Sequence, residues 1–400
     1  MTTLAGRQVV LGVTGGIAAY KACEIVRELR KEGANVVVVL TAAGSQFITP
    51  LTLQTLSKNP VHTDMFNLIS ESEIGHISLA QRAQLLLIAP ATANIIGKIR
   101  NGIADDLLST VAMATTAPIL LAPAMNSEMY ASPAVRENVE VLLDRGVTLI
   151  DPDEGDLACG TVGPGRLADT GKILEMARIL LADKILKGKK VVVAAGPTVE
   201  DIDPVRFLSN RASGKMGYAM AAVARRFGAE VTLVSGPTRL PDPPYMKVER
   251  VRSAREMKNA VEKAAENADA VVMVAAVADF RPDAAASRKI KKEELPERID
   301  LVPTDDILAS LGESKRSRVL IGFAAETNDI EENALAKMRR KNLDAIVAND
   351  VSRSDIGFDS DSNEVRVYFS DGTDLHLATA AKEAIATAVW RAVCHKFLKG

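Results

Sequence analysis

The chain has 400 residues and a mass of 42.7 kDa; 47% of the residues are hydrophobic and 25% are charged, which excludes a disordered or fibrous protein and predicts two or three globular domains. The formal net charge of −2 argues against broad electrostatic binding to nucleic acid or to an anionic membrane. Aromatic residues are only 4% of the chain, and its richness in Ala and Val favours an α/β fold.

Location and metal content are also constrained by composition. The longest apolar stretches fall far short of the roughly 18 to 20 residues that cross a bilayer, and the N-terminal segment has no signal-peptide core. The 3 cysteines and 4 histidines are scattered, so neither a disulfide framework nor a built-in zinc or iron site is expected. We expect a cytoplasmic protein with no membrane or nucleic-acid partner.

The first half opens with a strand–helix–strand unit. Gln8–Val13 is a short apolar strand, and Gly15-Gly16 leads into a helix expected over Ile17–Lys31. Asn35–Leu40 is the second buried strand, so the two strands should pair in parallel with a right-handed crossover. Later strands are expected at Leu85–Ala89, Pro118–Ala122 and Val147–Ile150, followed by a closing helix over Ala168–Leu186.

The same order begins again near residue 190, with a strand at Lys190–Ala195, a Gly196-Pro197 turn, a helix over Met216–Phe227 and a strand at Glu230–Ser235. We therefore predict domains 1–187 and 188–400, each a Rossmann-like open, mainly parallel sheet. Ligands should bind at the carboxyl ends of the strands. Later strands are expected at Ala270–Ala275, Val319–Gly322 and Ala345–Ala348, with an edge or interface hairpin from Glu364–Phe369 and Asp374–Leu377.

The turn at residues 12–17 joins a strand to a helix, where unpaired amides and the positive helix end suit a phosphate. The turn is not GxGxxG, and it lacks the lysine of a P-loop. Tight backbone geometry alone accounts for such a turn about half the time. The functional interpretation is a single-phosphate cofactor such as FMN.

Two loops place an amide after a strand: Asn94 follows the third strand and Asn126 the fourth. Helix capping is the simple explanation, but two such loops at one sheet edge favour a site. His76, just before a helical segment, is more often a surface or satisfied core residue than a functional one. Cys159 lies in a glycine-rich loop of the kind that closes over sites, where a thiol can transfer a proton.

In the second half, the basic loop at residues 206–217 is not a Walker motif, because Ser209 and Met216 stand where Gly and Ser or Thr are required. The loop is either an anion cradle at a helix start or a close helix–sheet contact. Beyond it, the alternating lysines of residues 288–292 are usually the solvated face of an edge strand. Alternatively, the carboxylates of Asp279, Asp305 and Asp306 could carry a hard cation, with the lysines on the phosphates of a triphosphate. The acidic and basic residues that could form this triphosphate site are Asp279, Lys289, Asp305, Asp306, Lys337 and Lys341.

The first half resembles the flavin-dependent decarboxylases that act on a cysteine carboxylate, through its GGIAAYK, GHI, PATAN, PAMNSEM and ACGxxGxGR segments. The resemblance implies that FMN takes a hydride equivalent from the cysteine moiety and returns it after CO2 departs. Cys159 would then supply a proton, His76 act as base or position the thiol, and Asn126 grip the carboxylate. One departure is Tyr130, where relatives usually have Trp. The implied FMN contacts are Gly15, Gly16, Ile17, Thr41, Thr92 and Asn94, and the implied substrate contacts are Asn126 and Met129.

The second half resembles phosphopantothenate–cysteine ligases, through AAGPTxExIDPVRFxxN, SGKMG, AAVADF, KIKK, GFAAET and KNLDAIVAND. The resemblance implies that CTP activates 4′-phosphopantothenate as an acyl-cytidylate, which the amine of cysteine then attacks. Lys289 would stabilise charge, Asn210 would hold the acyl-cytidylate, Arg206 would contact substrate, and Asp279 would hold Mg²⁺. Ala212 and Phe280 depart from the family pattern. The implied nucleotide contacts are Asp279, Lys289, Asp305, Asp306, Ile307, Leu308, Phe323, Lys337 and Lys341.

Together the halves predict a bifunctional enzyme of coenzyme A biosynthesis, because the product of the ligase half, 4′-phosphopantothenoylcysteine, is the substrate of the decarboxylase half. The resemblance also implies a homo-oligomer, a dodecamer of trimeric decarboxylase and dimeric ligase units. Two alternatives stay open: a flavin oxidoreductase with an unrelated nucleotide-binding domain, and a flavin-binding regulatory subunit without activity.

Overall fold

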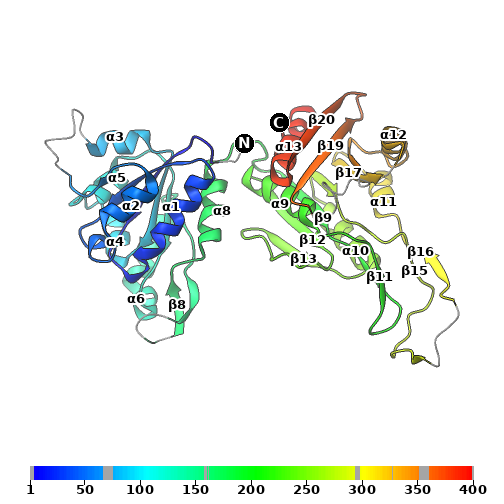
Figure 1. Cartoon of the computed structure of the whole chain (residues 1–400), viewed down its shortest axis with the longest axis horizontal. Coiled ribbons are helices and arrows are strands. Elements are labelled where there is room, and N and C mark those ends of the chain that lie inside the picture. The colour runs from blue at the N-terminus through cyan, green and yellow to red at the C-terminus, as the bar shows by residue number, and fades with distance from the viewer. Residues whose placement is uncertain are drawn as a thin grey trace. The chain divides into compact units, whose positions relative to one another are not determined.

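The computed structural model describes residues 4–65, 75–156, 160, 162–292, 298–326, 328–350 and 360–398. The chain divides into two compact units, Met1–Ala182 and Asp183–Gly400, called here the N-unit and the C-unit (Figure 1). The boundary expected near residue 187 falls just inside the C-unit. Among the described residues, no helix is long and apolar enough to cross a membrane.

The N-unit is built on six parallel strands in the order β3-β2-β1-β4-β5-β6. This is the doubly wound order whose direction of winding reverses between β1 and β4, which opens a crevice at their carboxyl ends. The strands are β1 (Gln8–Val13), β2 (Asn35–Leu40), β3 (Val61–His62), β4 (Leu85–Ala91), β5 (Ile119–Pro123) and β6 (Thr148–Leu149).

Helices cover both faces of this sheet because alternate strand residues point to opposite sides. Val9 and Leu11 join one buried cluster with α1, α2 and α8, whereas Val10 joins another with α3, α4, α5 and α7. A separate hairpin of β7 (Asp153–Asp156) and β8 (Val162–Arg166) precedes the last helix. The helices are η1 (Ile17–Lys21), α1 (Ala22–Lys31), η2 (Gly44–Gln46), α2 (Pro50–Ser57), α3 (Gly75–Arg82), α4 (Ala93–Asn101), α5 (Leu107–Ala114), α6 (Ser127–Ala131), α7 (Pro133–Asp144) and α8 (Thr170–Leu181).

The C-unit repeats the plan in an eight-stranded sheet of order β13-β12-β9-β14-β17-β18-β19-β20. The first six strands are parallel, and β19 and β20 extend the edge as an antiparallel hairpin. The winding reverses between β9 and β14. The strands are β9 (Lys190–Ala195), β12 (Glu230–Ser235), β13 (Lys247–Arg250), β14 (Ala270–Met273), β17 (Val319–Glu326), β18 (Ala345–Asp350), β19 (Ser362–Phe369) and β20 (Asp374–Ala381).

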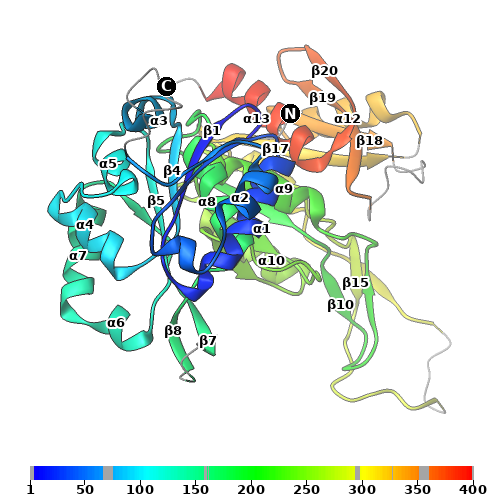
Figure 2. The same cartoon turned by 60° about the vertical axis from the view of Figure 1, so that its left-hand side comes forward.

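Helices α10, α11 and α12 bury one face of this sheet, and α9 and α13 pack on the other. The indole of Trp390 in α13 is fully buried and donates to the carbonyl of Met220 in α9 at 2.9 Å. Two small antiparallel pairs, β10–β11 and β15–β16, lie side by side at one edge (Figure 2). The remaining elements are α9 (Lys215–Arg226), α10 (Ala254–Ala265), α11 (Ile307–Glu313), α12 (Ile330–Arg340), α13 (Lys382–Phe397), β10 (Val199–Asp201), β11 (Phe207–Ser209), β15 (Phe280–Pro282) and β16 (Leu301–Pro303).

The α/β class with two open, mainly parallel sheets is confirmed, and two predicted helices need correction. The helix expected over Ile17–Lys31 begins as the 3-10 turn η1 before α1. The helix expected over Ala168–Leu186 ends at Leu181, because Ala182 adopts an extended backbone and the following residues dock on the C-unit. There Leu186 is fully buried, and its amide donates to the carbonyl of Phe227 at 2.9 Å.

Candidate active sites

The crevice of the N-unit is held together by Thr14, directly after β1. The Thr14 hydroxyl donates to the carbonyl of Pro90 at 2.7 Å and accepts from the amide of Thr92 at 3.2 Å. Thr14 is 3% exposed, so this hydroxyl has a structural task. It joins the loops after β1 and β4, the two strands between which the winding reverses.

Two glycines shape the floor of this crevice. A Cβ on Gly15 would stand 2.5 Å from the Cβ of Ala43, so only glycine lets the loop after β2 approach. A Cβ on Gly16 would meet only the methyl of Thr92, at 3.8 Å. Gly16 occupies the N-cap position of η1, and no side chain accepts a hydrogen bond from the first amides of that turn. This open, amide-lined turn fits a phosphate group.

Gly15→Ala is expected to reduce the FMN that co-purifies with the protein. The added methyl would force apart the loops after β1 and β2, and overpacking of this kind costs ~1–3 kcal/mol. The absorbance of bound flavin relative to protein measures the loss. Gly97→Ala in α4 is the matched control, because its Cβ would find only Asn138 Nδ2, at 3.6 Å. Equal flavin content in the two variants would contradict the role given to Gly15.

The remaining predicted FMN residues surround the same strand ends. The hydroxyl of Thr41 donates to the carbonyl of Val13 at 3.2 Å, which ties the end of β2 to β1. Thr92 occupies the N-cap position of α4 without a side-chain capping bond, and Asn94, the second residue of that helix, is exposed. Ile17 follows Gly16 and is 61% exposed. Their direct contacts with FMN remain a prediction, but their positions are compatible with it.

The buried polar atoms that have no hydrogen-bond partner within the described chain include Oγ of Ser127, directly after Asn126, and Nδ1 of His76, which lies in α3 at the other end of the N-unit from α6 (Figures 1 and 2). A bound group can satisfy such orphaned atoms. Asn126 caps α6, its Oδ1 accepting from the amide of Glu128 at 2.8 Å, and Met129 is half exposed. These observations fit a ligand at the end of β5.

The hairpin β7–β8 closes on this loop. The amide of Met125 donates to the carbonyl of Gly165 at 2.9 Å, and a Cβ on Gly165 would stand 2.2 Å from the carbonyl oxygen of Met125. A Cβ on Gly163 would likewise stand 2.7 Å from Ser127 Oγ. The glycines therefore allow β8 to lie directly against the loop that carries Asn126. Cys159 belongs to the sequence between β7 and β8 and lies outside the described residues.

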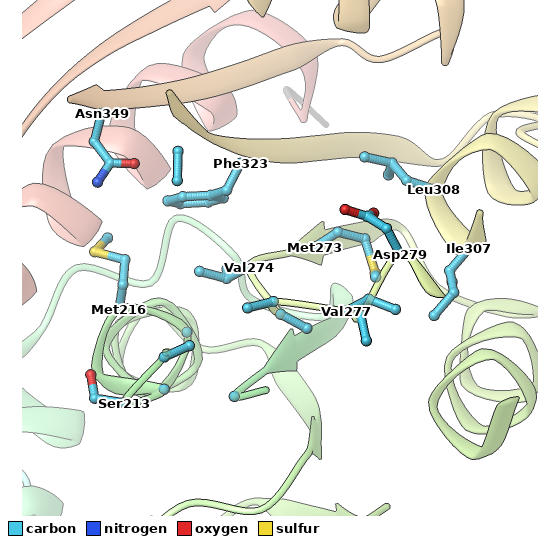
Figure 3. A pocket seen from close by; sticks show the side chains of 18 of the residues that line it. Ser213, Met216, Met273, Val274, Val277, Asp279, Ile307, Leu308, Phe323 and Asn349 are labelled. Atoms are coloured by element: carbon cyan, nitrogen blue, oxygen red, sulfur yellow. The ribbon is translucent and has the colours of Figure 1, made fainter. Parts of the chain in front are cut away.

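A cavity of about 460 Å³ lies in the C-unit at the carboxyl ends of its parallel strands (Figure 3). Phe323 and Ala325 face it from alternate positions of β17, while Ala324 between them packs in the core. Figure 3 shows Phe323 and Asn349 toward one end and Asp279, Ile307 and Leu308 toward the other. The predicted nucleotide residues that line it are Asp279, Asp305, Asp306, Ile307, Leu308, Phe323, Lys337 and Lys341.

Two lysines that line this cavity, Lys337 and Lys341, come from α12 and its C-cap. The Lys337 ammonium donates to the carbonyl of Phe323 at 2.9 Å, and the Lys341 ammonium lies 2.7 Å from a carboxylate oxygen of Asp306. Burial acts to raise the pKa of Asp306, but the bonds from Lys341 and from the amide of Ala309 lower it below its usual value. Asp306 therefore stays ionised beside Lys341.

Glycines and Thr238 determine where the cavity opens. Cβ atoms on Gly196 and on Gly214 would each stand 2.8 Å from the methyl of Thr238, in the loop after β12. A Cβ on Gly217 would stand 2.4 Å from the Cβ of Ala195. The β12 side is thus filled by protein, and the cavity extends toward β14, β17 and β18. The loop Ala212–Gly217 lines it at the start of α9, consistent with an anion cradle.

Three predicted ligase residues lie outside this lining. Asn210 Nδ2 donates to the carbonyls of Ala276 and Val277, at 3.2 and 3.1 Å; these two residues line the cavity, whereas Asn210 does not. The Arg206 guanidinium pairs with Asp203 at 2.7 Å. Lys289 is exposed in the loop after β15. The structure therefore does not bring Arg206, Asn210 and Lys289 into the cavity itself.

The loop that carries Lys289 is anchored by Asp203, which is 1% exposed. Burial alone would raise the pKa of Asp203, but the amides of Val205, Arg206 and Ile290 and the Arg206 guanidinium lower it to about 2. Arg206 also donates to the carbonyl of Ile290 at 2.6 Å. Asp203 and Arg206 thus hold the backbone next to Lys289.

Asp203→Asn is expected to destabilise the C-unit at neutral pH, because the variant loses the ion pair with Arg206. The ordinary pKa of an unfolded Asp is about 3.9. Since the folded pKa is depressed, ionised Asp203 stabilises the fold above about pH 4, and this stabilisation is lost as the pH falls toward about 2. Denaturant unfolding across this range should show the difference from wild type narrowing below about pH 4. A difference independent of pH would contradict the role of the charge.

Six polar residues that sequence reasoning did not assign also line the cavity: Ser213, Lys215, Thr304, Asn349, Asn363 and Lys382. Asn349 carried a usable signal, since it is a polar residue at the carboxyl end of a predicted parallel strand. Lys215 lay in the basic loop considered as an anion cradle. Asn363 and Lys382 gave no local signal, because they enter through the hairpin β19–β20 and the helix that follows it.

The fold defines a two-domain α/β protein with a candidate site at the carboxyl ends of the parallel strands in each domain, and both sites are compatible with phosphorylated ligands. Family models match both units: "Flavoprotein" over residues 1–181 and "DNA/pantothenate metabolism flavoprotein C-terminal domain" over residues 186–397. The bifunctional coenzyme A biosynthesis protein CoaBC of Bacillus subtilis is 48% identical over 95% of this chain and 94% of its own. The Escherichia coli protein of that name is 47% identical over 92% of each chain. The chain belongs to the CoaBC family of bifunctional coenzyme A biosynthesis enzymes.

Two solved structures are also similar. The C-terminal domain of a CoaBC protein is 42% identical and covers 55% of this chain and 100% of its own, with a TM-score of 0.47. A PPC decarboxylase mutant complexed with pantothenoylaminoethenethiol is 32% identical and covers 44% of this chain and 97% of its own, with a TM-score of 0.39. The predicted class of protein is confirmed: a bifunctional enzyme of coenzyme A biosynthesis, with decarboxylase and ligase activities and FMN as cofactor.

Proposed function

We propose that the C-unit joins 4′-phosphopantothenate to cysteine with CTP, and that the N-unit decarboxylates the product to 4′-phosphopantetheine. The observation that carries the ligase assignment is the cavity, which gathers acids, lysines and an aromatic wall from α11, α12 and β17. These residues are far apart in sequence, and the family motifs select eight of them for a nucleotide.

In the ligase reaction, a carboxylate oxygen of 4′-phosphopantothenate attacks the α-phosphorus of CTP, and pyrophosphate leaves. Lys337, Lys341 and the first amides of α9 would hold phosphate oxygens, and Phe323 would pack against the nucleotide. Lys289 would add positive charge from the loop that Asp203 anchors. Asn210 would hold the acyl-cytidylate, beside the wall at Ala276.

The amine of cysteine then attacks the acyl carbon, and CMP leaves as the amide bond forms. We assign Mg²⁺ to this site with CTP, with Asp279 as its protein ligand. Within the described residues, no three His, Cys, Asp or Glu side chains are grouped to hold a metal ion. The ion would therefore be bound jointly by Asp279 and the triphosphate, as is usual for Mg²⁺ in nucleotide sites.

In the decarboxylase reaction, FMN supplies reversible hydride transfer when it is bound at the turn around Gly16. Asn126 would orient the substrate carboxylate, because a side-chain amide can donate to it while its oxygen caps α6. His76 would receive or hold the thiol proton through its ring. Cys159 would deliver a proton to the substrate after CO2 departs.

The closed β12 side of the C-unit weighs against the oxidoreductase alternative. In dinucleotide-binding folds, an acidic residue about 20 residues beyond the glycine turn holds a ribose. Here Ser235 ends β12, Gly236 and Pro237 follow it, and the methyl of Thr238 fills the space beside Gly196 and Gly214. The cavity therefore does not favour a bound NAD(P)H.

We also propose that the enzyme is a cytoplasmic homo-oligomer, a dodecamer of trimeric decarboxylase and dimeric ligase units. Exposed apolar side chains support association of each unit. Ile17 and Tyr20 are 61% and 59% exposed beside the flavin turn, and Phe207 and Phe280 are about half exposed on the small sheets.

The proposed function is tested by purifying the full chain and supplying 4′-phosphopantothenate, cysteine, CTP and Mg²⁺. A flavin spectrum, pyrophosphate and CO2 are all expected. Release of pyrophosphate without CO2 would leave only the ligase half of the proposal, and release of neither would overturn it. Consumption of NAD(P)H without pyrophosphate would favour the oxidoreductase.

A further inference from the structure

The cavity wall that carries Asp279 is a loop whose other residues have no polar side chain to hold it. The loop follows β14, and residues 274–278 read Val-Ala-Ala-Val-Ala. All five line the cavity together with Asp279. Backbone amides and carbonyls that are withdrawn from water need hydrogen-bond partners, so other segments of the chain must supply them.

Thr198, directly before β10, supplies two of these partners. Its hydroxyl accepts from the amide of Ala278 at 2.9 Å, and its own amide donates to the carbonyl of Ala276 at 3.2 Å. The carbonyl of Thr198 accepts from the hydroxyl of Ser209 in β11 at 2.8 Å. Thr198 is fully buried and does not line the cavity, so it joins the cavity wall to the small sheet β10–β11 without reaching a ligand.

A second threonine holds the same loop from another segment. The hydroxyl of Thr304, directly after β16, donates to the carbonyl of Ala278, and its amide donates to the carbonyl of Asp279 at 3.0 Å. Both polar backbone groups of Ala278 are thus bonded to threonine hydroxyls, one 80 residues before it and the other 26 residues after it.

The Asp279 side chain, in contrast, has no protein partner. Among the described residues, its carboxylate makes no hydrogen bond or ion pair, whereas Asp305 and Asp306 pair with Lys258 and Lys341 at 3.1 and 2.7 Å. Figure 3 shows the Asp279 carboxylate among the side chains that line the cavity. A carboxylate without a side-chain partner is positioned only by the backbone that carries it. The two threonines therefore determine where this carboxylate lies.

We infer that Thr198 is a positioning residue of the ligase: together with Thr304 it fixes the backbone at Ala278, and so holds Asp279 ready for the Mg²⁺ of the nucleotide. The inference rests on the proposed function and deepens it, because it explains how an exposed carboxylate without a protein partner keeps its place. Branching at the Cβ of threonine restricts χ1, which keeps the hydroxyl directed at the loop. Thr198 acts only through Asp279.

Thr198→Val in the full chain removes the hydroxyl and keeps nearly the same shape. Calorimetric titration with CTP, once with Mg²⁺ and once with EDTA, measures the effect on binding. With Mg²⁺ the affinity for CTP should fall about 3- to 10-fold, the range that one neutral hydrogen bond contributes. With EDTA the affinity should change less than about twofold, because Asp279 then has no cation to bind.

Thr198→Ser keeps the hydroxyl and should bind CTP with Mg²⁺ to within about twofold of wild type. Thr304→Val removes the other side-chain bond to Ala278, so it gives an independent reading if Thr198→Val does not fold, and the same loss confined to Mg²⁺ is expected. Thr387→Val is the matched control. It deletes a hydroxyl that donates to the carbonyl of Glu383 at 2.8 Å in α13, outside the cavity lining, and should bind CTP as wild type does.

Equal losses of CTP affinity with Mg²⁺ and with EDTA would overturn the inference, because Thr198 would then support the whole cavity and not Asp279 in particular. Unchanged affinity in Thr198→Val, or a Thr198→Ser variant as weak as Thr198→Val, would also overturn it. If Mg²⁺ does not strengthen CTP binding by wild type, the inference fails while the ligase assignment stands on pyrophosphate release. If wild type releases no pyrophosphate from CTP and 4′-phosphopantothenate, the proposed function itself fails.

Discussion

The Cys159→Ser variant is expected to bind FMN, to ligate at the wild-type rate and to form 4′-phosphopantetheine about 10²- to 10⁴-fold more slowly, the usual contribution of a general acid. A serine hydroxyl is a far weaker acid than a thiol, so it cannot return the proton at neutral pH. The reaction should stop after CO2 release, with the oxidised, decarboxylated substrate accumulating. Mass spectrometry of the small-molecule products measures this accumulation.

Cys23→Ser is the matched control for this variant. Burial raises the pKa of the Cys23 thiol, which lies in α1, so this cysteine is a poor proton donor and its replacement should leave product formation unchanged. Normal turnover by Cys159→Ser would remove Cys159 from the mechanism. Loss of flavin from the variant would instead indicate a structural role for the loop between β7 and β8.

The Lys289→Met variant is expected to lose ligase activity about 10²- to 10³-fold in kcat while keeping the decarboxylase activity. The reason is electrostatic. Negative charge develops on the phosphate oxygens during the reaction, and the variant lacks the lysine cation that would stabilise it. Removing one such stabilising group typically lowers kcat by this factor. Because Lys289 is exposed and outside the cavity lining, its ammonium must approach when substrates bind, and the KM for CTP should change less than kcat.

Pyrophosphate release measures the ligase step, and CO2 release from added 4′-phosphopantothenoylcysteine measures the decarboxylase step. Lys247→Met is the control, since Lys247 is an exposed lysine on the edge strand β13, outside the cavity lining. If Lys289→Met keeps the wild-type kcat, the charge that stabilises this step must come from the lysines inside the cavity, Lys337 and Lys341.

Local patterns were sufficient to predict the two units. The apolar strand, glycine turn and helix around Gly15, and again around Gly196, depend on residues within about thirty positions, and hydrophobic periodicity reports them directly. The motif residues Asp279, Phe323 and Lys337 then converge on one cavity, since parallel strands bring their carboxyl ends to one edge. Helix ends were less well predicted, as at Leu181, because the residues after it dock on the C-unit.

The sequence by itself determined the α/β class, the two repeats and the loops that carry chemistry, because these follow from local spacing and turn residues. Only the tertiary structure decided that Asn363 and Lys382 belong to the ligase cavity. The sequence predicts the hairpin β19–β20 only as an edge or interface element. Because β19 pairs with β18, the start of this hairpin lies at the carboxyl ends of the parallel strands, and α13 then packs against α9. Such contacts depend on long-range packing, and no pattern within either segment encodes them.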